Sequence, residues 1–246
     1  MLEVSEIKQV HLEVSSICNA RCPGCPRNLF GYPFNNGYVE HNMTLEEAKI
    51  IFKDIIKQLQ GVQFNGNFGD AASNNNTPDI IKWMIEQNSS ISIHITTNGS
   101  AQNDAFWEQL GSLGICVEFC IDGLEDTHHI YRQDTNFKKI FKNAKTFVDA
   151  GGIAECRMIL FEYNKHQEDD LKELALKSGF SRFTTLDNTR ENLSSYDKKG
   201  NLVHVIDRLE PTVFDELEFR KNNDLVIDDI VANKKVKSCV FCEAKN

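Results

Sequence analysis

Short β-prone segments alternate with helical segments about six times along the chain, and this alternation restricts the fold more than any other feature. Strands are expected at 11–15, 62–67, 91–98, 115–122, 154–161 and 183–186. Between them, apolar residues recur at helical spacing within 45–59, 81–85, 137–147 and 171–175. Thr44, followed by Glu47, has the spacing of a capping box at the start of the first helix. This order favours a mostly parallel sheet with crossover helices.

The strand segments carry apolar residues on one face and polar residues on the other. Ile91, Ile93 and Ile95 alternate with polar residues, and side chains two positions apart share a face of a strand. A doubly wound sheet is covered by helices on both faces, so its central strands are nearly continuous apolar runs. The alternation instead predicts an α/β fold with a polar interior, in which the sheet is an incompletely closed barrel. Because six units are present rather than eight, we expect a partial (β/α)6 TIM-type barrel.

The barrel pattern covers residues 1–187, and residues 188–246 are expected to form a C-terminal extension. In the extension the strand and helix pattern weakens, the sequence SSYDKKGN at 194–201 reads as a turn, and Pro211 interrupts the next segment. A chain of 246 residues is long enough for one main domain with a short appendage.

Composition narrows the cellular setting and the class of partner. The sequence holds no apolar run near the roughly 20 residues that span a bilayer, and its first ten residues lack the layout of a secretion signal. We therefore expect a cytoplasmic protein that does not enter a membrane. Its eight cysteines are then expected to be reduced and available as metal ligands. A formal net charge of −9 disfavours a nucleic-acid substrate, because it repels phosphate backbones.

Three cysteines converge within eight residues directly after the first expected strand, as Cys18-Asn-Ala-Arg-Cys22-Pro-Gly-Cys25. This is where the active-site loops of a barrel emerge. Structural zinc sites take four protein ligands, and ferredoxins supply four cysteines to each cluster. Three thiolates on a four-iron cluster leave one iron with an open position, which favours catalysis over electron storage.

The spacing C-x-x-x-C-x-x-C after a first strand resembles the radical S-adenosylmethionine superfamily. The resemblance continues at the ends of later strands, in Gly69-Asp70, in Thr97-Asn98-Gly99 and in Cys120-Ile121-Asp122-Gly123. The stretch 126–132 is similar to the branch of that family that carries SPASM or twitch extensions. By this resemblance, residues 188–246 are expected to hold a truncated element of that kind.

The resemblance implies a 4Fe-4S cluster on Cys18, Cys22 and Cys25 and S-adenosylmethionine bound at its open iron. It further implies that the cofactor-binding residues are Gly69, Asp70, Asn98, Cys120, Asp122 and Arg157. Asp70 is expected to accept hydrogen bonds from the methionine ammonium group, although Gly-Asp is also a common turn pair. Asn98 is expected near the carboxylate or a ribose hydroxyl, Cys120 and Asp122 near the ribose, and Arg157 near the carboxylate; Arg132 is a looser candidate.

Two residues depart from the family pattern, and several others allow more than one reading. Gly24 stands where an aromatic residue is usual, and Asp70 stands where Glu is usual, so adenine packing and carboxylate reach would change. His94 reads equally as a substrate-binding base or as a hydrogen-bonded interior histidine. The remaining thiols divide into Cys116 and Cys156, expected to be buried and structural, and a C-x-x-C pair, Cys239 and Cys242. This pair resembles the opening of an auxiliary-cluster module whose other ligands the sequence lacks.

These features predict an enzyme that cleaves S-adenosylmethionine reductively to a 5′-deoxyadenosyl radical and abstracts hydrogen from a peptide or a small molecule. An electron donor such as flavodoxin or ferredoxin is implied as a partner. Two alternatives stay open: an iron-sulfur electron-transfer protein whose cluster never meets S-adenosylmethionine, and a catalytically degenerate partner subunit.

Overall fold

The computed structural model describes residues 3–33, 39–188 and 192–209, and its centre is a sheet of six parallel strands. The strands lie in the order β1 (Gln9–His11), β4 (Gly61–Asn65), β5 (Ser92–Thr97), β6 (Cys116–Cys120), β7 (Ile153–Leu160) and β8 (Arg182–Asp187). Neighbours in space are also neighbours among the predicted strands, and every pairing is parallel. The sheet therefore confirms the partial-barrel prediction.

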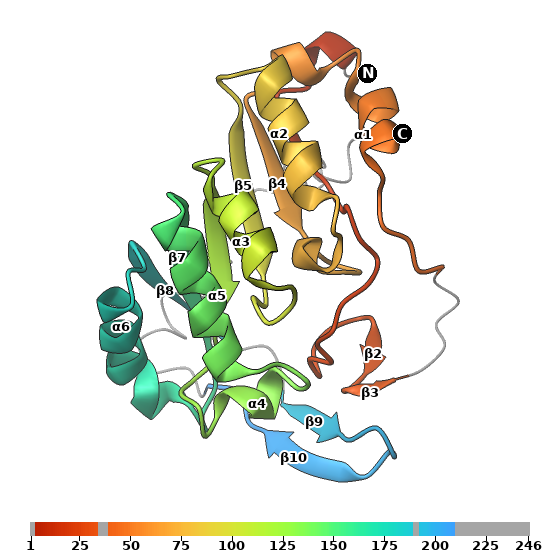
Figure 1. The fold of residues 1–246 in the computed structure, drawn as a ribbon. Coiled ribbons are helices and arrows are strands. Elements are labelled where there is room, and N and C mark those ends of the chain that lie inside the picture. The colour runs from red at the N-terminus through yellow and green to blue at the C-terminus, as the bar shows by residue number, and fades with distance from the viewer. Residues whose placement is uncertain (1–2, 34–38, 189–191, 210–246) are drawn as a thin grey trace, which may run out of the picture.

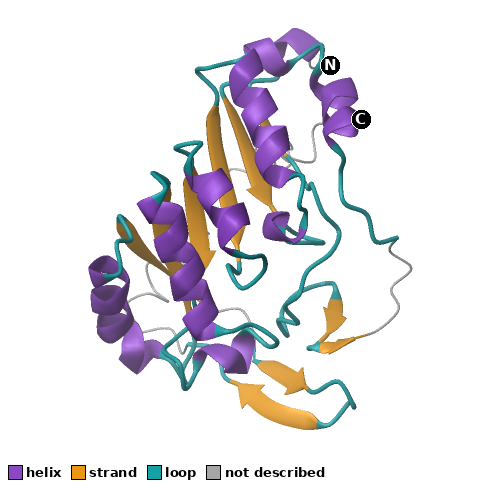
Figure 2. Ribbon diagram, in the orientation of Figure 1, coloured by secondary structure: helices purple, strands orange, loops and turns teal. Residues whose placement is uncertain are grey.

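Helices cover one face of this sheet, as crossover connections between parallel strands require (Figures 1 and 2). They are α1 (Leu45–Phe52), α2 (Thr77–Gln87), α3 (Asp104–Gly111), α5 (Phe137–Asp149) and α6 (Glu168–Lys177), with a short α4 (His128–Tyr131). Single 3-10 turns occur at η1 (Val4–Glu6), η2 (Ile56–Gln58), η3 (Ala71–Ser73) and η4 (Lys165–Gln167). Two hairpins complete the described residues: β2 (Asn28–Leu29) with β3 (Tyr32–Pro33), and β9 (Leu193–Tyr196) with β10 (Leu202–Ile206).

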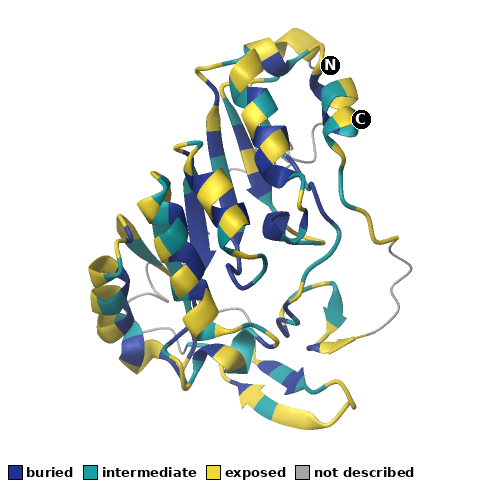
Figure 3. Ribbon diagram, viewed as in Figure 1, coloured by how far each residue is buried: buried dark blue, intermediate teal, exposed yellow. Residues whose placement is uncertain are grey.

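The hydrophobic core lies between the sheet and these helices (Figure 3). Trp107 on α3 packs its ring 5.3 Å from Phe119 on β6 and 6.3 Å from Phe147 on α5. Ile93 and Ile95 on β5 are buried against the same layer, as their predicted alternation requires. In α1, Ala48 and Phe52 are buried, whereas Ile51 is 53% exposed, and the helix ends at Phe52, before the end of the expected segment 45–59.

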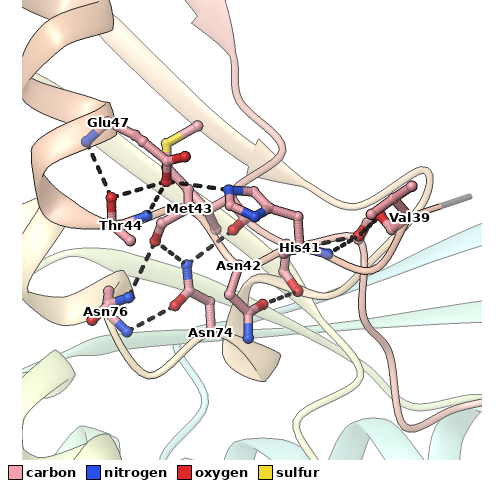
Figure 4. Close-up of polar contacts among 11 residues, drawn as sticks. Val39, His41, Asn42, Met43, Thr44, Glu47, Asn74 and Asn76 are labelled. Carbon is pink, nitrogen blue, oxygen red and sulfur yellow. Dashed lines mark hydrogen bonds and ion pairs between the residues drawn. The ribbon is translucent and has the colours of Figure 1, made fainter.

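The connection between β1 and α1 is fixed by side chains that bond to backbone groups (Figure 4). Thr44 accepts a hydrogen bond from the Glu47 backbone N–H at 3.2 Å, and the Glu47 carboxylate accepts one from the Thr44 N–H at 2.7 Å. This capping box confirms the predicted start of α1. Asn74 donates to the carbonyl oxygens of Val14 and Met43 at 2.9 and 2.8 Å. These bonds tie the chain after β1 to the loop after β4.

The β9–β10 hairpin packs against the main domain through a second, small apolar cluster. Leu193 and Ile206 are buried with Phe161, and Tyr131 packs at the edge of this cluster. The turn of the hairpin is formed by Asp197, whose side chain accepts hydrogen bonds from the backbone N–H groups of residues 199 and 201. Only the second half of the predicted turn 194–201 is therefore a turn, because Ser194–Tyr196 belong to β9.

The predicted boundary at 187/188 stays a prediction, and Cys239 and Cys242 lie outside the described residues. Within the part of the chain that the structure describes, no helix has the length and apolar character needed to cross a membrane.

Candidate active site

A cavity of about 400 Å³ opens where the parallel strands end, in the size range of small-molecule sites. Eight of the nine residues that the sequence nominated line it: Cys18, Cys22, Cys25, Gly69, Asp70, Asn98, Cys120 and Arg157. Asp122 does not line the cavity and is completely buried. The position of the cavity agrees with the rule that barrel sites lie at the carboxyl ends of the strands.

The cysteine loop follows β1 and is held by contacts with distant segments. Arg21 forms an ion pair with Asp134 at 2.6 Å, and its backbone N–H donates to the Gln133 carbonyl at 3.1 Å. Within the loop, the Cys25 N–H donates to the Cys22 carbonyl at 3.0 Å, and the Ala20 N–H lies 3.4 Å from the Cys18 sulfur. The loop geometry therefore depends on tertiary contacts to residues 133 and 134 as well as on local turns.

The three thiols form an electrostatically coupled group that fits a metal cluster. Cys22 is buried, and Cys18 and Cys25 are partly buried. Burial raises the pKa of Cys18 to about 12, with smaller contributions from Asp70 and Cys22, and burial raises the pKa of Cys22 to about 11. Without metal the Cys18 and Cys22 thiols stay protonated at neutral pH, whereas a bound cation would supply the charge that stabilises thiolates. The donor set of three convergent thiols suits iron, with one iron left open to a ligand.

Asp70 holds the floor of the cavity with four hydrogen bonds. Its Oδ1 accepts from the Ala72 N–H at 2.9 Å and from the Thr97 hydroxyl at 2.7 Å. Its Oδ2 accepts from the Asn98 backbone N–H at 2.8 Å and side-chain Nδ2 at 2.7 Å. A carboxylate has about four acceptor positions, so the protein already uses those of Asp70. Burial raises the pKa of Asp70, while these bonds oppose the rise.

Asn98 links this carboxylate to the cysteine loop. Its Nδ2 lies 3.0 Å from Asn19 Oδ1 and 3.6 Å from the Cys18 sulfur, and its Oδ1 accepts from the Ser100 N–H at 2.9 Å. Both ends of the Asn98 amide are therefore engaged. The network that runs from Asp70 through Asn98 to Cys18 positions the first cysteine.

Asp122 acts through Arg132, which does line the cavity. The Asp122 Oδ2 pairs with Arg132 Nε at 2.5 Å, and its Oδ1 accepts from the Ile159 N–H at 2.6 Å. Arg132 Nη1 lies 3.7 Å from the Cys22 sulfur. The interaction with Asp122 keeps the pKa of the Arg132 guanidinium high despite its burial. A permanent positive charge is thus held beside a candidate cluster ligand.

His128 helps to hold Asp122 in place through hydrogen bonds of its ring. The Asp122 backbone N–H donates to His128 Nδ1 at 3.1 Å, so Nε2 carries the proton and faces the Thr135 hydroxyl at 3.0 Å. Burial lowers the pKa of His128 to about 3. The imidazole therefore stays neutral and serves as a structural link between β6 and the loop after α4.

Two polar atoms in the cavity wall lack partners among the described residues. Arg157 pairs with Glu118 through Nη1 at 2.9 Å and contacts the Cys120 sulfur through Nη2 at 3.3 Å, but its Nε has no hydrogen-bond partner. Asn65 Oδ1 on β4 is likewise buried and unpaired. Buried polar atoms of this kind need a partner, and a polar ligand in the cavity would supply one.

Glycines make room in the cavity wall. A Cβ at Gly24 would lie 2.8 Å from the Tyr131 hydroxyl, because the ring of Tyr131 on α4 occupies that space. The departure at Gly24 therefore coincides with an aromatic side chain brought in from another segment. At Gly69 a Cβ would lie 1.9 Å from the Ser15 carbonyl oxygen, so a larger residue there would push the end of β1 away.

Sequence reasoning missed Arg27, Asn65 and Tyr131, all of which line the cavity. Asn65 lies on the predicted polar face of its strand, so period two was a usable signal. Arg27 and Tyr131 carry no such signal. The prediction that Cys116 is buried is wrong, because its side chain is only partly buried. Cys116 and Glu118 are two positions apart on β6, so both lie on the polar face of the strand. Cys156 is completely buried, as expected.

The model of the Radical SAM superfamily matches residues 12–175. Among solved structures, Streptococcus suis SuiB bound to S-adenosylmethionine is similar with a TM-score of 0.61 and 16% identity, covering 93% of this chain and 49% of SuiB. Native anSMEcpe with bound AdoMet gives a TM-score of 0.61 at 16% identity, covering 94% of this chain and 63% of that protein.

Methylornithine synthase (PylB) is similar over 74% of this chain and 54% of its own, with a TM-score of 0.55 and 11% identity. The chain thus spans about half the length of SuiB and PylB. Curated protein sequences give no match. The fold similarity and the family match over two thirds of the chain agree with the cavity geometry. The chain belongs to the radical SAM superfamily, whose enzymes use a 4Fe-4S cluster and S-adenosylmethionine.

Proposed function

We propose that the cluster binds to Cys18, Cys22 and Cys25, that S-adenosylmethionine binds in the adjoining cavity, and that the substrate is a peptide. The observation that carries the proposal is the convergence of three free thiols on one wall of the cavity at the strand ends. When bound there, the cofactors supply the electron transfer that cleaves S-adenosylmethionine to methionine and a 5′-deoxyadenosyl radical. The chain itself must hold the ligands, orient the substrate and exclude water.

Arg132 balances the negative charge of the cluster ligands. Its guanidinium, fixed by Asp122, lies against Cys22, and such a contact favours the thiolate over the thiol. Charge-assisted hydrogen bonds of this type are about twice as strong as neutral ones. We infer that Arg132 tunes the cluster environment and that Asp122 is a positioning residue that acts through Arg132.

The unpaired atoms of Arg157 and Asn65 are the groups that would contact S-adenosylmethionine. Arg157 carries a positive charge that suits the methionine carboxylate, and Asn65 Oδ1 accepts hydrogen bonds, which suits an ammonium or hydroxyl group. Asp70 and Asn98 are saturated by protein donors and acceptors. We therefore assign Asp70 and Asn98 to positioning the cysteine loop, and Gly69 and Cys120 to the wall of the cavity.

Tyr131 is proposed to supply the aromatic wall that the family pattern places before the third cysteine. Its ring lies against Gly24 and packs on Phe161 at a centroid distance of 4.9 Å. Burial holds the pKa of its hydroxyl above the usual range, so the group stays neutral. A neutral, fixed ring beside the cavity would pack against adenine and keep water from the reacting atoms.

A peptide substrate is supported by the solved structures. SuiB has been crystallised with the precursor peptide SuiA, and anSMEcpe with a peptide named Cp18Cys. The stretch 126–132, which resembles the branch with SPASM or twitch extensions, provides Arg132 and Tyr131. The electron donor is proposed to be a flavodoxin or ferredoxin, because the reaction needs a single electron of low potential.

The test is anaerobic reconstitution of the full-length chain with iron and sulfide, reduction with dithionite, and chromatography for 5′-deoxyadenosine. We expect about four irons per chain and product in the wild type, and loss of both in Cys22→Ala. Cys156→Ala is the matched control, because that thiol is buried on the opposite face of β7; it should keep both. A loaded cluster without product would refute the proposal and favour an electron-transfer protein.

Substrate class is tested in the same assay with deuterated pools. One pool is a tryptic digest of perdeuterated cell protein, and the other is the small-molecule extract of the same cells. Deuterium transferred to 5′-deoxyadenosine from the digest alone supports a peptide substrate. Transfer from the extract alone would overturn the peptide proposal while leaving the cleavage reaction intact.

A further inference from the structure

A second group of metal-binding side chains lies on the polar face of the sheet, away from the active-site cavity. His94 is the third residue of β5, Cys116 the first of β6 and Glu155 the third of β7. One ligand atom from each, a ring nitrogen, the sulfur and a carboxylate oxygen, lies within 4.8 Å of the other two. His94 pairs in register with Cys116, and Cys116 pairs with Ile153, two residues before Glu155. Three adjacent strands thus supply one ligand each.

This group is separated from the cavity by distance and by an ion pair. Thr96 and Arg157, which line the cavity, lie two residues beyond His94 and Glu155, or about 7 Å along a strand. Between the two levels, Glu118 pairs with Arg157 at 2.9 Å. The group lies in the amino-terminal halves of β5, β6 and β7, whereas the cavity lies at the carboxyl ends of the strands. The proposed reaction uses none of its three side chains.

The donor atoms identify the class of metal. Ca²⁺ and Mg²⁺ prefer all-oxygen sites, whereas one nitrogen, one sulfur and one oxygen suit a borderline ion such as Zn²⁺. Three protein ligands leave a fourth position for water, as in zinc sites with an open position. All three side chains are partly buried, so they are shielded but still reachable by an ion from solvent.

Charge balance also allows an ion to enter. In the metal-free arrangement Cys116 donates a hydrogen bond to Glu155, and burial raises the pKa of the thiol to about 11. Glu155 also pairs with Arg182, whose side chain is 59% exposed, whereas that of Glu155 is 15% exposed. A divalent ion can therefore replace the thiol proton and the Arg182 guanidinium, which is free to turn into solvent. The local net charge then changes little.

We propose that His94, Cys116 and Glu155 form a zinc site at the end of the barrel opposite the radical chemistry. The site is independent of the proposed substrate, because its ligands lie outside the cavity. The bound ion joins β5, β6 and β7 on the polar face of the sheet, beside the ion pair between Glu155 and Arg182.

The test is zinc content after full-length protein, reconstituted anaerobically with iron and sulfide, is equilibrated with Zn²⁺ and passed over a chelating resin. We expect about one zinc per chain at this site in the wild type. His94→Gln and Cys116→Ser should each lose that equivalent, with unchanged iron content and far-ultraviolet circular dichroism as the measure of intact folding. Cys239→Ser combined with Cys242→Ser is the control for zinc bound by the other cysteine pair.

Two further measurements make the test decisive. Co²⁺ added to the chain before reconstitution should give a thiolate-to-cobalt charge-transfer band that Cys116→Ser removes. Arg182→Ala should tighten zinc binding several-fold, because it removes the competing cation. The proposal is overturned if the wild type holds no zinc, if both His94→Gln and Cys116→Ser keep all of it, or if only the Cys239 and Cys242 variant loses it.

Discussion

Replacing Asp70 by Asn tests whether this carboxylate positions the loops or binds S-adenosylmethionine. The amide offers one acceptor oxygen where the carboxylate offers two, so donors on one side lose their partner. If the new NH₂ group replaces Oδ1, the Thr97 oxygen can accept from it, but the Ala72 N–H and the Thr97 hydroxyl proton both lose their acceptor. If it replaces Oδ2, both Asn98 donors are lost. Either orientation leaves buried donors without an acceptor, and one such group costs about 1–3 kcal/mol.

A loss of about 2 kcal/mol corresponds to a Tm about 4–8 °C lower in a chain of this size. The assay is thermal unfolding of the reconstituted full-length protein, together with calorimetric titration of S-adenosylmethionine. Asp79→Asn, an exposed carboxylate on α2, is the control and should change Tm by less than about 2 °C. If Asp70→Asn has the same Tm as the control while its affinity for S-adenosylmethionine falls more than about tenfold, Asp70 contacts the ligand. The assignment of Asp70 to positioning the cysteine loop is then wrong.

Three other predictions follow from the same region. Gly69→Ala should prevent accumulation of folded protein in a solubility assay, because the added Cβ would collide with the backbone of Ser15. Gly114→Ala has open space around the Cβ but a φ of +65°, so it should lower the free energy of unfolding in urea by only about 1–2 kcal/mol. Equal behaviour of the two variants would contradict this prediction. The pKa of His128 is lower in the folded protein, about 3, than the unfolded value of 6.5, so its contribution to stability is present above pH 6.5 and is lost progressively below it. Between pH 6.5 and 5 this loss is about 2 kcal/mol. His128→Gln should flatten that part of a plot of unfolding free energy against pH for the cluster-free chain. An unchanged slope would refute the assignment of this pH dependence to His128. Gly24→Ala should weaken S-adenosylmethionine binding by about 1–3 kcal/mol through overpacking against the Tyr131 hydroxyl. Tyr131→Phe removes that hydroxyl, so the double variant should regain the affinity measured by calorimetry. Additive losses in the double variant would count against this explanation.

Much of the fold follows from local patterns. The alternation of Ile91, Ile93 and Ile95 places β5 and its buried face correctly, and runs of the same kind locate β4, β6, β7 and β8. The first strand was expected at 11–15, but β1 is Gln9–His11, so the two share only His11. Helix α3 was missed although Asn103 caps it and accepts from the Phe106 N–H at 3.1 Å, because two turns give too few apolar repeats to recognise. The first helix was predicted with the right start, but it ends at Phe52, earlier than the expected segment 45–59.

Only part of the site could be predicted from the sequence, because some of its residues depend on where a strand ends and on how distant segments pack. Asp122 was expected in the cavity because it continues the polar alternation of Cys120, but β6 ends at Cys120 and the period-two rule ends with it. Tyr131 and Arg132 reach the cysteine loop across about 110 residues of sequence. Contacts of that range depend on how α4 packs, which no local pattern reports.

The anchoring of the cysteine loop has a consequence for cluster assembly and repair. Arg21 holds the loop through Asp134 and through the carbonyl oxygens of Gly31 and Gln133, and none of these contacts involves a metal. The conformational entropy of ordering the loop is therefore lost when the chain folds, before iron arrives. A new cluster delivered after oxidative loss then binds to a loop that is already ordered. A chain stripped of iron should therefore accept a replacement cluster without refolding.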